Sequence, residues 1–305
     1  MNEDNYIRFD WAVKRLLRNK ANFGVLEGFL KTLLSDDIKI VEILESESNQ
    51  ENESDKFNRV DIKAKDSRGE IIIVEIQNTR ELYYLERILY GVAKAITEHI
   101  NLGDSYALVK KVYSISIIYF DLGKGNDYLY KGSAHFNGIN TGDELEVSIK
   151  ERSVIVKKTP EAIFPEYYLI RVNEFDKLAV TPLDEWISYL KTGYIPIQAT
   201  APGLSEAREK LRYYDMQPVE RQAYDRHMDS IRIQNDVLNS AKEEGLAEGE
   251  AKGKAEGFAE GEAKGETKGL AEGKRLTAIN MKERGISADI ISACTDLTIE
   301  EIDKL

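Results

Sequence analysis

Residues 58–78 read NRVDIKAKDSRGEIIIVEIQN, and this stretch decides the fold. Its first part, residues 60–65, alternates apolar and polar side chains, which predicts a strand with one solvated face. Its last part, residues 71–77, is a nearly continuous β-branched run, which predicts a strand that is buried on both faces. The DSRG sequence between them, residues 66–69, has the composition of a tight turn. The stretch therefore predicts a β-hairpin.

One acidic residue, Glu75, interrupts the apolar strand of this hairpin, and a second acid lies on the neighbouring strand. Side chains alternate along a strand, so Glu75 and Gln77 lie on one face near the end of the second strand. Asp61, on the first strand, can reach the same place. A buried carboxylate needs a partner that offsets its desolvation. Two carboxylates and an amide at one edge of a sheet therefore indicate a site for a divalent cation.

Other motifs surround the hairpin in a definite order. Phe9, Asp10 and Lys14 fall in the first expected helix, Arg87 and Tyr90 in the helix after the hairpin, and Gly103, Asp104 and Tyr106 before the next hydrophobic strand. With Asp61 and the Glu75-Ile76-Gln77 sequence, these motifs resemble the PD-(D/E)XK nuclease family transposases, also described as Rpn family recombination-promoting nucleases. The resemblance covers roughly residues 5–150 and, more loosely, the repeat-bearing C-terminal part.

The resemblance implies a fold, an activity and a cofactor. The fold is α/β: a restriction-endonuclease-like mixed sheet flanked by helices, followed by an α-helical C-terminal region. The activity is a Mg²⁺-dependent DNA endonuclease associated with recombination or transposition, with Mn²⁺ as an alternative ion. Asp61, Glu75 and the backbone carbonyl of Ile76 would hold the ion. DNA is the implied partner.

The resemblance also gives roles to six further side chains: catalytic roles to Gln77, Asp10 and Lys14, and substrate contacts to Arg87, Tyr90 and Lys63. Gln77 stands where the family signature usually has lysine, so it can orient a group by hydrogen bonding but brings no positive charge. The residues alone leave alternatives open. Asp10 and Lys14 are also compatible with a surface ion pair at i, i+4, and Arg87 and Tyr90 with side chains that cover the core.

The overall charge opposes strong non-specific DNA binding. The chain carries 42 Lys and Arg against 54 Asp and Glu, a net charge of −12, whereas DNA-binding proteins usually present a basic surface. A nuclease therefore needs basic residues concentrated near its cleft. The candidates are Lys14, Arg15, Arg18, Lys20, Arg59, Lys63, Lys65, Arg80 and Arg87. The acidic balance and the missing lysine favour an alternative function, a PD-(D/E)XK-like scaffold with weak or no catalytic activity.

Composition also limits the compartment. The single cysteine, Cys294, excludes a disulfide framework and favours a reducing cytoplasm. No apolar run approaches the length of a bilayer span, so we expect no membrane partner. The N-terminus begins with acidic residues and lacks a continuous apolar region, so we expect no secretory signal.

The remaining pattern predicts a mixed α/β sheet and then helices. We expect helices over residues 6–34 (broken near 22–24), 79–100, 182–192 and 204–240 (interrupted near Pro218), and further strands over residues 38–44, 111–120, 128–130, 154–156 and 167–172. The helix over 79–100 should join two strands in a βαβ crossover. Its expected buried stripe is Leu82, Leu85, Ile88, Leu89, Val92 and Ile96. The polar, acidic residues 45–56 are expected to be a mobile loop.

The C-terminal part carries a glycine at every fourth position from Gly245 to Gly273. Eight glycines destabilise a helix by about 6–8 kcal/mol relative to alanine. We therefore expect a helix here only if the glycines permit the close approach of a partner helix. The alternative is a flexible spacer. We expect homo-oligomerisation through this repeat. The expected domains are residues 1–195 (nuclease-like), 204–240 (helical connector), 241–274 (glycine repeat) and 275–305 (small helical assembly element).

The last thirty or so residues predict short helices on either side of Gly285, and a further helix that begins at Thr298 with a capping box to Glu301. Helix-turn-helix DNA readers show similar patterns. The second of these helices, however, offers no Arg or Lys to a DNA groove. An assembly element is therefore favoured over a DNA reader.

Overall fold

The structure is a computed structural model that describes residues 6–15, 20–44, 60–151 and 154–305. The expected mobile loop over residues 45–56 lies outside this part of the chain. The backbone divides into two compact units, residues 1–226 and 227–305. In the described part of the chain, no helix combines the length and the apolar character that crossing a membrane requires.

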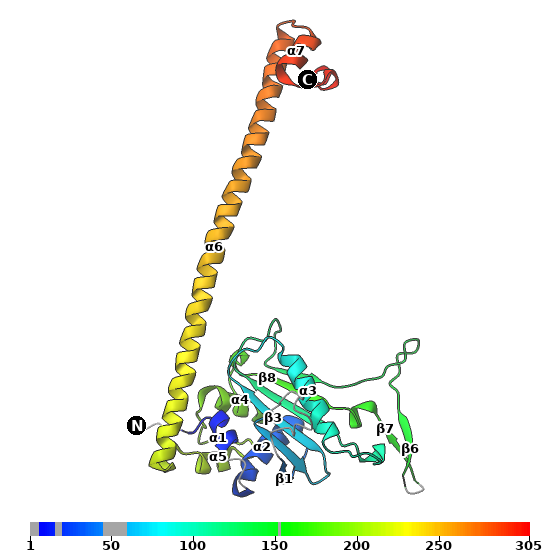
Figure 1. Cartoon of the computed structure of the whole chain (residues 1–305), viewed down its shortest axis with the longest axis vertical. Helices are drawn as coiled ribbons and strands as arrows, with labels where there is room; N and C mark the ends of the chain where they lie inside the picture. Colours follow the sequence, from blue (N-terminus) through cyan, green and yellow to red (C-terminus); the bar gives the residue numbers. More distant parts are fainter. Residues whose placement is uncertain (1–5, 16–19, 45–59, 152–153) are drawn as a thin grey trace. The chain divides into compact units, whose positions relative to one another are not determined.

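A six-stranded sheet is the centre of the first unit (Figure 1). Its strands are arranged in the order β1-β2-β3-β4-β8-β5. Their bounds are β1 Ile40–Leu44, β2 Ile62–Asp66, β3 Ile71–Gln77, β4 Val112–Ile118, β8 Glu166–Arg171 and β5 Leu129–Gly132. The three strands β3, β4 and β8 run parallel, while β1, β2 and β5 pair antiparallel with their neighbours. The predicted mixed sheet is confirmed. β6 (Val147–Glu151) and β7 (Val154–Lys158) form a separate antiparallel pair.

The predicted hairpin is β2 and β3. Their antiparallel register places Ile62 opposite Val74 and Ala64 opposite Ile72. Gly69 in the turn has a φ of 80°, a conformation that glycine adopts without steric cost. Residues 71–76 are all buried, because β3 lies between β2 and β4 in the sheet and is covered on both faces. The apolar sequence of β3 thus fits its central position.

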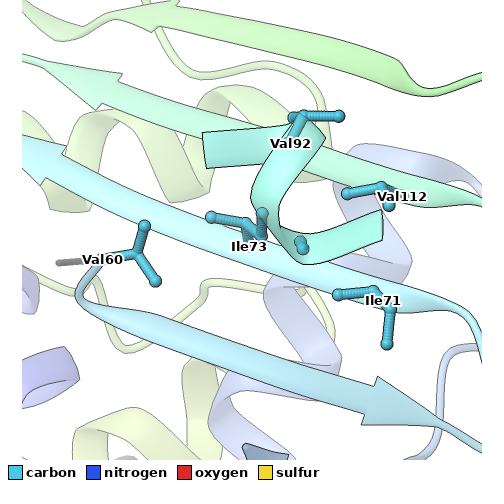
Figure 2. Close-up of a cluster of buried hydrophobic side chains, with 6 residues drawn as sticks. Val60, Ile71, Ile73, Val92 and Val112 are labelled. Carbon is cyan, nitrogen blue, oxygen red and sulfur yellow. The ribbon is translucent and has the colours of Figure 1, made fainter. Parts of the chain in front are cut away.

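One face of the sheet is covered by α3 (Tyr84–Thr97), which joins the parallel strands β3 and β4. This is the predicted βαβ crossover. Val92 of α3 packs with Ile73 and Ile71 of β3 and with Val112 of β4, as Figure 2 shows. Gly91 and Ala95 are also buried, so small side chains let the helix backbone approach the strands closely.

The other flanking helices are α1 (Phe9–Arg15), α2 (Phe23–Leu34), α4 (Pro182–Thr192) and α5 (Leu204–Lys210). A short 3₁₀ helix, Lys20–Asn22, precedes α2 at the predicted break. Phe9, Phe29, Trp186 and Tyr189 meet in the aromatic centre of these helices. All four side chains are fully buried, so this second core fixes α1, and with it Asp10, against the rest of the unit.

The predicted buried stripe of α3 is partly wrong. Leu82, which precedes the helix, is 85% exposed, and Leu85 and Leu89 are 55% and 61% exposed. Two predicted positions, Ile88 and Val92, are buried, and the other buried positions are Tyr84, Gly91 and Ala95. The sequence offers two neighbouring apolar faces on this helix. The face that packs against the sheet is the one that also brings Arg87 to Glu75, which supplies the partner that the buried acid requires.

The second unit consists of most of α6 (Pro218–Glu283), with α7 (Ala288–Thr295) and α8 (Ile299–Asp303). Pro218 begins α6, and the helix continues through all eight repeat glycines, so the helical alternative holds for this segment. A Cβ atom added at any of these glycines would meet no other atom within 4 Å. Ala278, Ile291 and Ile302 form a small core between the three helices. The predicted capping box of Thr298 and Glu301 is confirmed.

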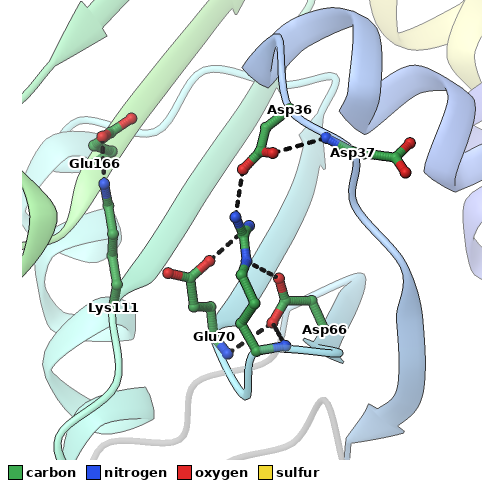
Figure 3. A network of polar contacts seen from close by, with 7 residues as sticks. Asp36, Asp37, Asp66, Glu70, Lys111 and Glu166 are labelled. Carbon is green, nitrogen blue, oxygen red and sulfur yellow. Dashed lines mark hydrogen bonds and ion pairs between the residues drawn. The ribbon is translucent and has the colours of Figure 1, made fainter.

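Ion pairs hold the end of the sheet where the β2–β3 turn lies (Figure 3). Arg68 binds Asp36, Asp66 and Glu70 at 2.5, 3.0 and 2.7 Å. Beside this group, Lys111 Nζ lies 2.5 Å from Glu166 Oε1, and their side chains are only 9% and 7% exposed. The Tyr168 hydroxyl donates to the other Glu166 oxygen at 2.6 Å. Burial alone would raise the pKa of Glu166, but Lys111 and Tyr168 lower it below its ordinary value.

Glu166→Gln should destabilise the fold by about 2 kcal/mol near neutral pH, because it leaves the buried Lys111 without its anion. The pKa of Glu166 is lower in the folded state, so the stabilisation is present above the unfolded pKa of about 4.3 and is lost as the pH falls through the folded pKa. Urea unfolding over a pH series should therefore show the two proteins converging at acidic pH. Glu206→Gln, which affects a partly exposed ion pair with Lys210 away from Glu166, is the control. A difference that does not depend on pH would contradict this account.

Candidate active site

The candidate active site lies where β3 ends. Asp61 is the residue before β2, and its Oδ2 accepts a hydrogen bond of 2.7 Å from the backbone N–H of Ile76. Ile62 lies opposite Val74 in the antiparallel register, so the next position along each strand places Asp61 opposite Glu75. The structure therefore brings the two predicted acids to the same point of the hairpin.

The backbone of Ile76 faces the same side. The carbonyl of Gln77 accepts a hydrogen bond of 3.0 Å from the Tyr119 N–H, on the β4 side of the strand. Backbone groups of successive strand residues point to opposite neighbours. The Ile76 N–H and carbonyl therefore face the β2 side, where Asp61 already binds the N–H. The predicted carbonyl ligand and the predicted carboxylate ligand share one edge of β3.

Glu75 is 6% exposed and forms an ion pair with Arg87 of α3. Arg87 also forms an ion pair with Glu81, in the loop between β3 and α3. Burial would lower the pKa of Arg87, but the two carboxylates outweigh it and raise the pKa. The guanidinium therefore stays charged, and it offsets the desolvation of Glu75. This contact also shows that Arg87 lies at the predicted site.

Gln77 is fixed by the same loop. Its Nε2 donates to the Thr79 carbonyl at 3.1 Å and to Glu81 Oε1 at 3.0 Å, with the Thr79 hydroxyl oxygen at 3.4 Å. Glu81 thus accepts hydrogen bonds from both Gln77 and Arg87. Glu75, Arg87, Glu81 and Gln77 form a continuous chain of polar contacts, which we call the Glu75–Gln77 network.

Tyr84 and Ser116 complete the surroundings of Glu75. Ser116 lies opposite Glu75 on the β4 side of β3, and Tyr84 is fully buried in the first turn of α3. Burial, followed by the nearby charge of Glu75, raises the pKa of Tyr84 above its ordinary value. The phenol therefore stays protonated at neutral pH and retains an O–H that can donate.

Asp10 is fully buried at the same end of the sheet. Its Oδ1 accepts from Arg8 Nε at 3.3 Å and from the Trp11 N–H at 3.0 Å. Its Oδ2 accepts from Asn78 Nδ2 at 3.4 Å. Asp10 therefore holds α1 to the residue that follows Gln77, and these contacts connect it to the site through Asn78.

Three predicted site residues remain: Lys63, Tyr90 and Lys14. Lys63 Nζ binds Glu98 at 2.7 Å, near the C-terminal end of α3, so its ammonium group is directed to that acid. Tyr90 is half-buried and follows Arg87 by three residues on α3, which makes the two neighbours on the helix surface. Lys14 belongs to α1, but its side chain lies outside the described part of the structure.

Sequence reasoning missed Glu81, Thr79 and Tyr84. The helix was expected to begin at residue 79, but α3 begins at Tyr84. Residues 79–83 therefore form a loop that surrounds the Gln77 amide, instead of a first helical turn that points away from it. A glutamate four residues after Gln77 is a weak signal on its own, because its role depends on where the helix begins.

The donor set fits a small divalent cation. Two carboxylates, Glu75 and Glu81, pair with a single guanidinium, Arg87, and Asp61 lies opposite Glu75 in the hairpin register. In the described part of the chain, no three His, Cys, Asp or Glu side chains are gathered closely enough to form a metal cage. Mg²⁺ commonly uses one or two carboxylates and keeps several waters. Asp61, Glu75 and the Ile76 carbonyl would supply two carboxylates and a carbonyl oxygen of this kind.

The mixed sheet with a βαβ crossover, and the acids Asp61 and Glu75 on neighbouring strands of its hairpin, define an α/β protein of the PD-(D/E)XK nuclease class. The family model described as PD-(D/E)XK nuclease family transposase matches residues 7–241, and the chain belongs to this family. No curated protein and no solved structure matches the chain.

Arg87→Leu should destabilise the protein by about 2 kcal/mol, because it leaves the buried Glu75 without its cation. Mg²⁺ should then raise the thermal midpoint of the variant more than that of the wild type, since the ion replaces the lost positive charge and no longer competes with the guanidinium. Differential scanning fluorimetry with and without Mg²⁺ measures both effects. Arg80→Leu, at an exposed position in the same loop, is the control. Equal Mg²⁺ shifts in Arg87→Leu and wild type would argue against a cation site at Glu75.

Proposed function

We propose that this chain is a metal-dependent endodeoxyribonuclease that acts in recombination or transposition, with residues 1–195 as its catalytic domain. Membership of the nuclease family supports this proposal. The single observation that carries it is the placement of Asp61 opposite Glu75, with the Asp61 carboxylate bound to Ile76 at 2.7 Å. Acids at neighbouring positions repel each other unless a cation lies between or beside them.

Asp61, Glu75 and the Ile76 carbonyl would hold Mg²⁺ or Mn²⁺. When bound, the ion would polarise the scissile phosphate and lower the pKa of a water molecule. Arg87 neutralises Glu75 in the absence of the ion. With Glu75 engaged by the ion, the guanidinium is available to bind phosphate oxygens, for which its planar donors are well suited.

The basic residues that were predicted near the cleft contribute unequally to DNA binding. Lys63 and Arg87 are each bound to carboxylates, while the side chains of Lys14, Arg15, Arg18 and Arg59 lie outside the described part of the structure. Arg80 and Lys20 are exposed. We therefore propose DNA binding that is weak without a divalent cation and sensitive to salt.

Supercoiled-plasmid cleavage with Mg²⁺ or Mn²⁺ tests the proposed activity. Asp61→Asn and Glu75→Gln should each reduce cleavage by about 100-fold, the scale of losing one electrostatic contact to a transition state. Both variants keep the shape of the side chain. Glu86→Gln, an exposed acid on α3, should cleave as the wild type does. Cleavage that survives both substitutions would refute the proposed site.

A second candidate function is an interaction or scaffold protein. The ion pair of Glu75 with Arg87 favours it, because a carboxylate held by an arginine is also a purely structural arrangement. A wild-type protein that neither cleaves DNA nor binds Mn²⁺ would support this function.

We also propose that the glycine repeat of α6 mediates self-association. All eight glycines leave open space at their Cβ positions within the chain, so a second copy can approach the helix backbone there. Replacing Gly253, Gly257 and Gly261 by leucine should dissociate the oligomer while the helix persists, because leucine is a good helix former but prevents close backbone approach. Sedimentation velocity and circular dichroism of the full chain measure the two effects, with Ala251, Ala255 and Ala259 to leucine as the matched control. Unchanged sedimentation would rule out this contact.

A further inference from the structure

The orientation of the Gln77 amide is determined by its neighbours. Three oxygen atoms surround Nε2: the Thr79 carbonyl at 3.1 Å, Glu81 Oε1 at 3.0 Å and the Thr79 hydroxyl at 3.4 Å. An amide nitrogen has two hydrogens to donate and no lone pair to accept with. Amide oxygen and nitrogen are distinguished by their hydrogen-bond partners. A carbonyl and a carboxylate oxygen cannot donate, so the nitrogen must occupy this position.

The loop acid that accepts from Gln77 is itself held in place. Glu81 binds Arg87, and Arg87 binds Glu75. The position of the Gln77 amide is therefore coupled to the acid of the candidate metal site. The two strongest acceptors, at 3.0 and 3.1 Å, use the two N–H groups of Gln77. In the described part of the chain, the amide oxygen Oε1 receives no hydrogen bond.

We propose that Gln77 acts through its oxygen, as a donor to the divalent cation, and that Glu81 is the positioning residue that holds the amide in this orientation. The inference rests on the proposed cation site at Asp61 and Glu75. Carbonyl oxygens of amide side chains are suitable ligands for hard cations. The residue in the lysine position of the nuclease signature thus has a different chemical role in this chain: it supplies a lone pair where lysine supplies a positive charge.

This role has a consequence for the reverse substitution. In Gln77→Lys, the ammonium group would lie where Nε2 now lies, beside Glu81 and the Thr79 carbonyl. It would form an ion pair with Glu81 and offer no oxygen to the cation. Restoring the lysine of the family signature should therefore weaken cation binding instead of improving the site.

Mn²⁺ binding to the full chain, measured by isothermal titration calorimetry, tests the inference without requiring cleavage. Gln77→Leu and Gln77→Lys should each weaken Mn²⁺ binding by about tenfold, the lower end of losses seen when a metal's supporting groups are removed. The exchanged pair, Gln77→Glu with Glu81→Gln, keeps a hydrogen bond between positions 77 and 81 with its direction reversed, the total charge and an oxygen at position 77, and loses only the bond to the Thr79 carbonyl. It should bind Mn²⁺ within about threefold of the wild type.

A double-mutant cycle tests the positioning role of Glu81. Glu81→Ala should weaken Mn²⁺ binding in the wild type, but should have no further effect when Gln77 is already leucine, because its influence passes through that amide. If Glu81 acted through Arg87 instead, its effect would persist in the Gln77→Leu background. Glu86→Ala, an exposed acid nearby on α3, controls for the loss of one negative charge.

The outcomes separate this inference from the proposed nuclease function. Mn²⁺ binding that depends on Asp61 but is unchanged by Gln77→Leu and Gln77→Lys would overturn the inference and leave the nuclease proposal standing. Faster plasmid cleavage by Gln77→Lys would also overturn it. Binding that depends on both Asp61 and Gln77, without any cleavage, would support the inference and contradict the nuclease proposal. A wild-type chain that binds no Mn²⁺ would overturn both.

Discussion

The ion pair between Glu75 and Arg87 is the contact on which the rest of the site depends. Glu75 belongs to a central strand whose residues 71–76 are all buried, where a carboxylate without a partner is costly. Arg87 meets this need from α3, and in doing so it selects which side of the helix faces the sheet. Tyr84 is buried as a result, while Leu85 and Leu89 face outward. Burial of two leucines could stabilise the protein by a few kcal/mol, so their exposure indicates that charge compensation and close packing of Gly91 and Ala95 outweigh it.

The balance between burying apolar side chains of α3 and neutralising Glu75 explains which features could be predicted from the sequence. The β2–β3 hairpin and the βαβ crossover follow from local patterns: alternation, a β-branched run, a glycine turn and a helical period between two apolar strands. The rotation of α3 is a non-local choice between two apolar faces. It was predicted wrongly because it depends on Glu75, twelve residues before Arg87, and on the small residues that let the helix approach the sheet. The role of Glu81 could not be predicted for a related reason, since it depends on a helix start five residues later than residue 79.

The glycine repeat illustrates the same limit in the C-terminal part. The pattern predicted a helix or a spacer, and the segment is helical. Positions four residues apart advance about 40° around a helix, so the stripe from Gly245 to Gly273 winds about 280°. One full turn takes about 54 Å, much less than the supercoil pitch of about 150 Å for two-stranded coiled coils. A partner helix therefore cannot follow the whole stripe. It can cross at a few consecutive glycines, at an angle near −50°, and different parts of the stripe face different directions.

The charge of the site links metal binding to DNA binding. Glu75 and Glu81 share one guanidinium, Arg87, so these three side chains carry one excess negative charge in a chain whose net charge is −12. A phosphate that approaches this group of acids is repelled while Arg87 is held by Glu75 and Glu81. At the proposed site a divalent cation would add positive charge, and its contact with Glu75 would weaken the hold on the guanidinium. The cation would therefore provide both an attractive field for the phosphate and a released arginine to bind it. Under the proposed function, an acidic protein that lacks the signature lysine would in this way make its affinity for DNA conditional on the metal ion.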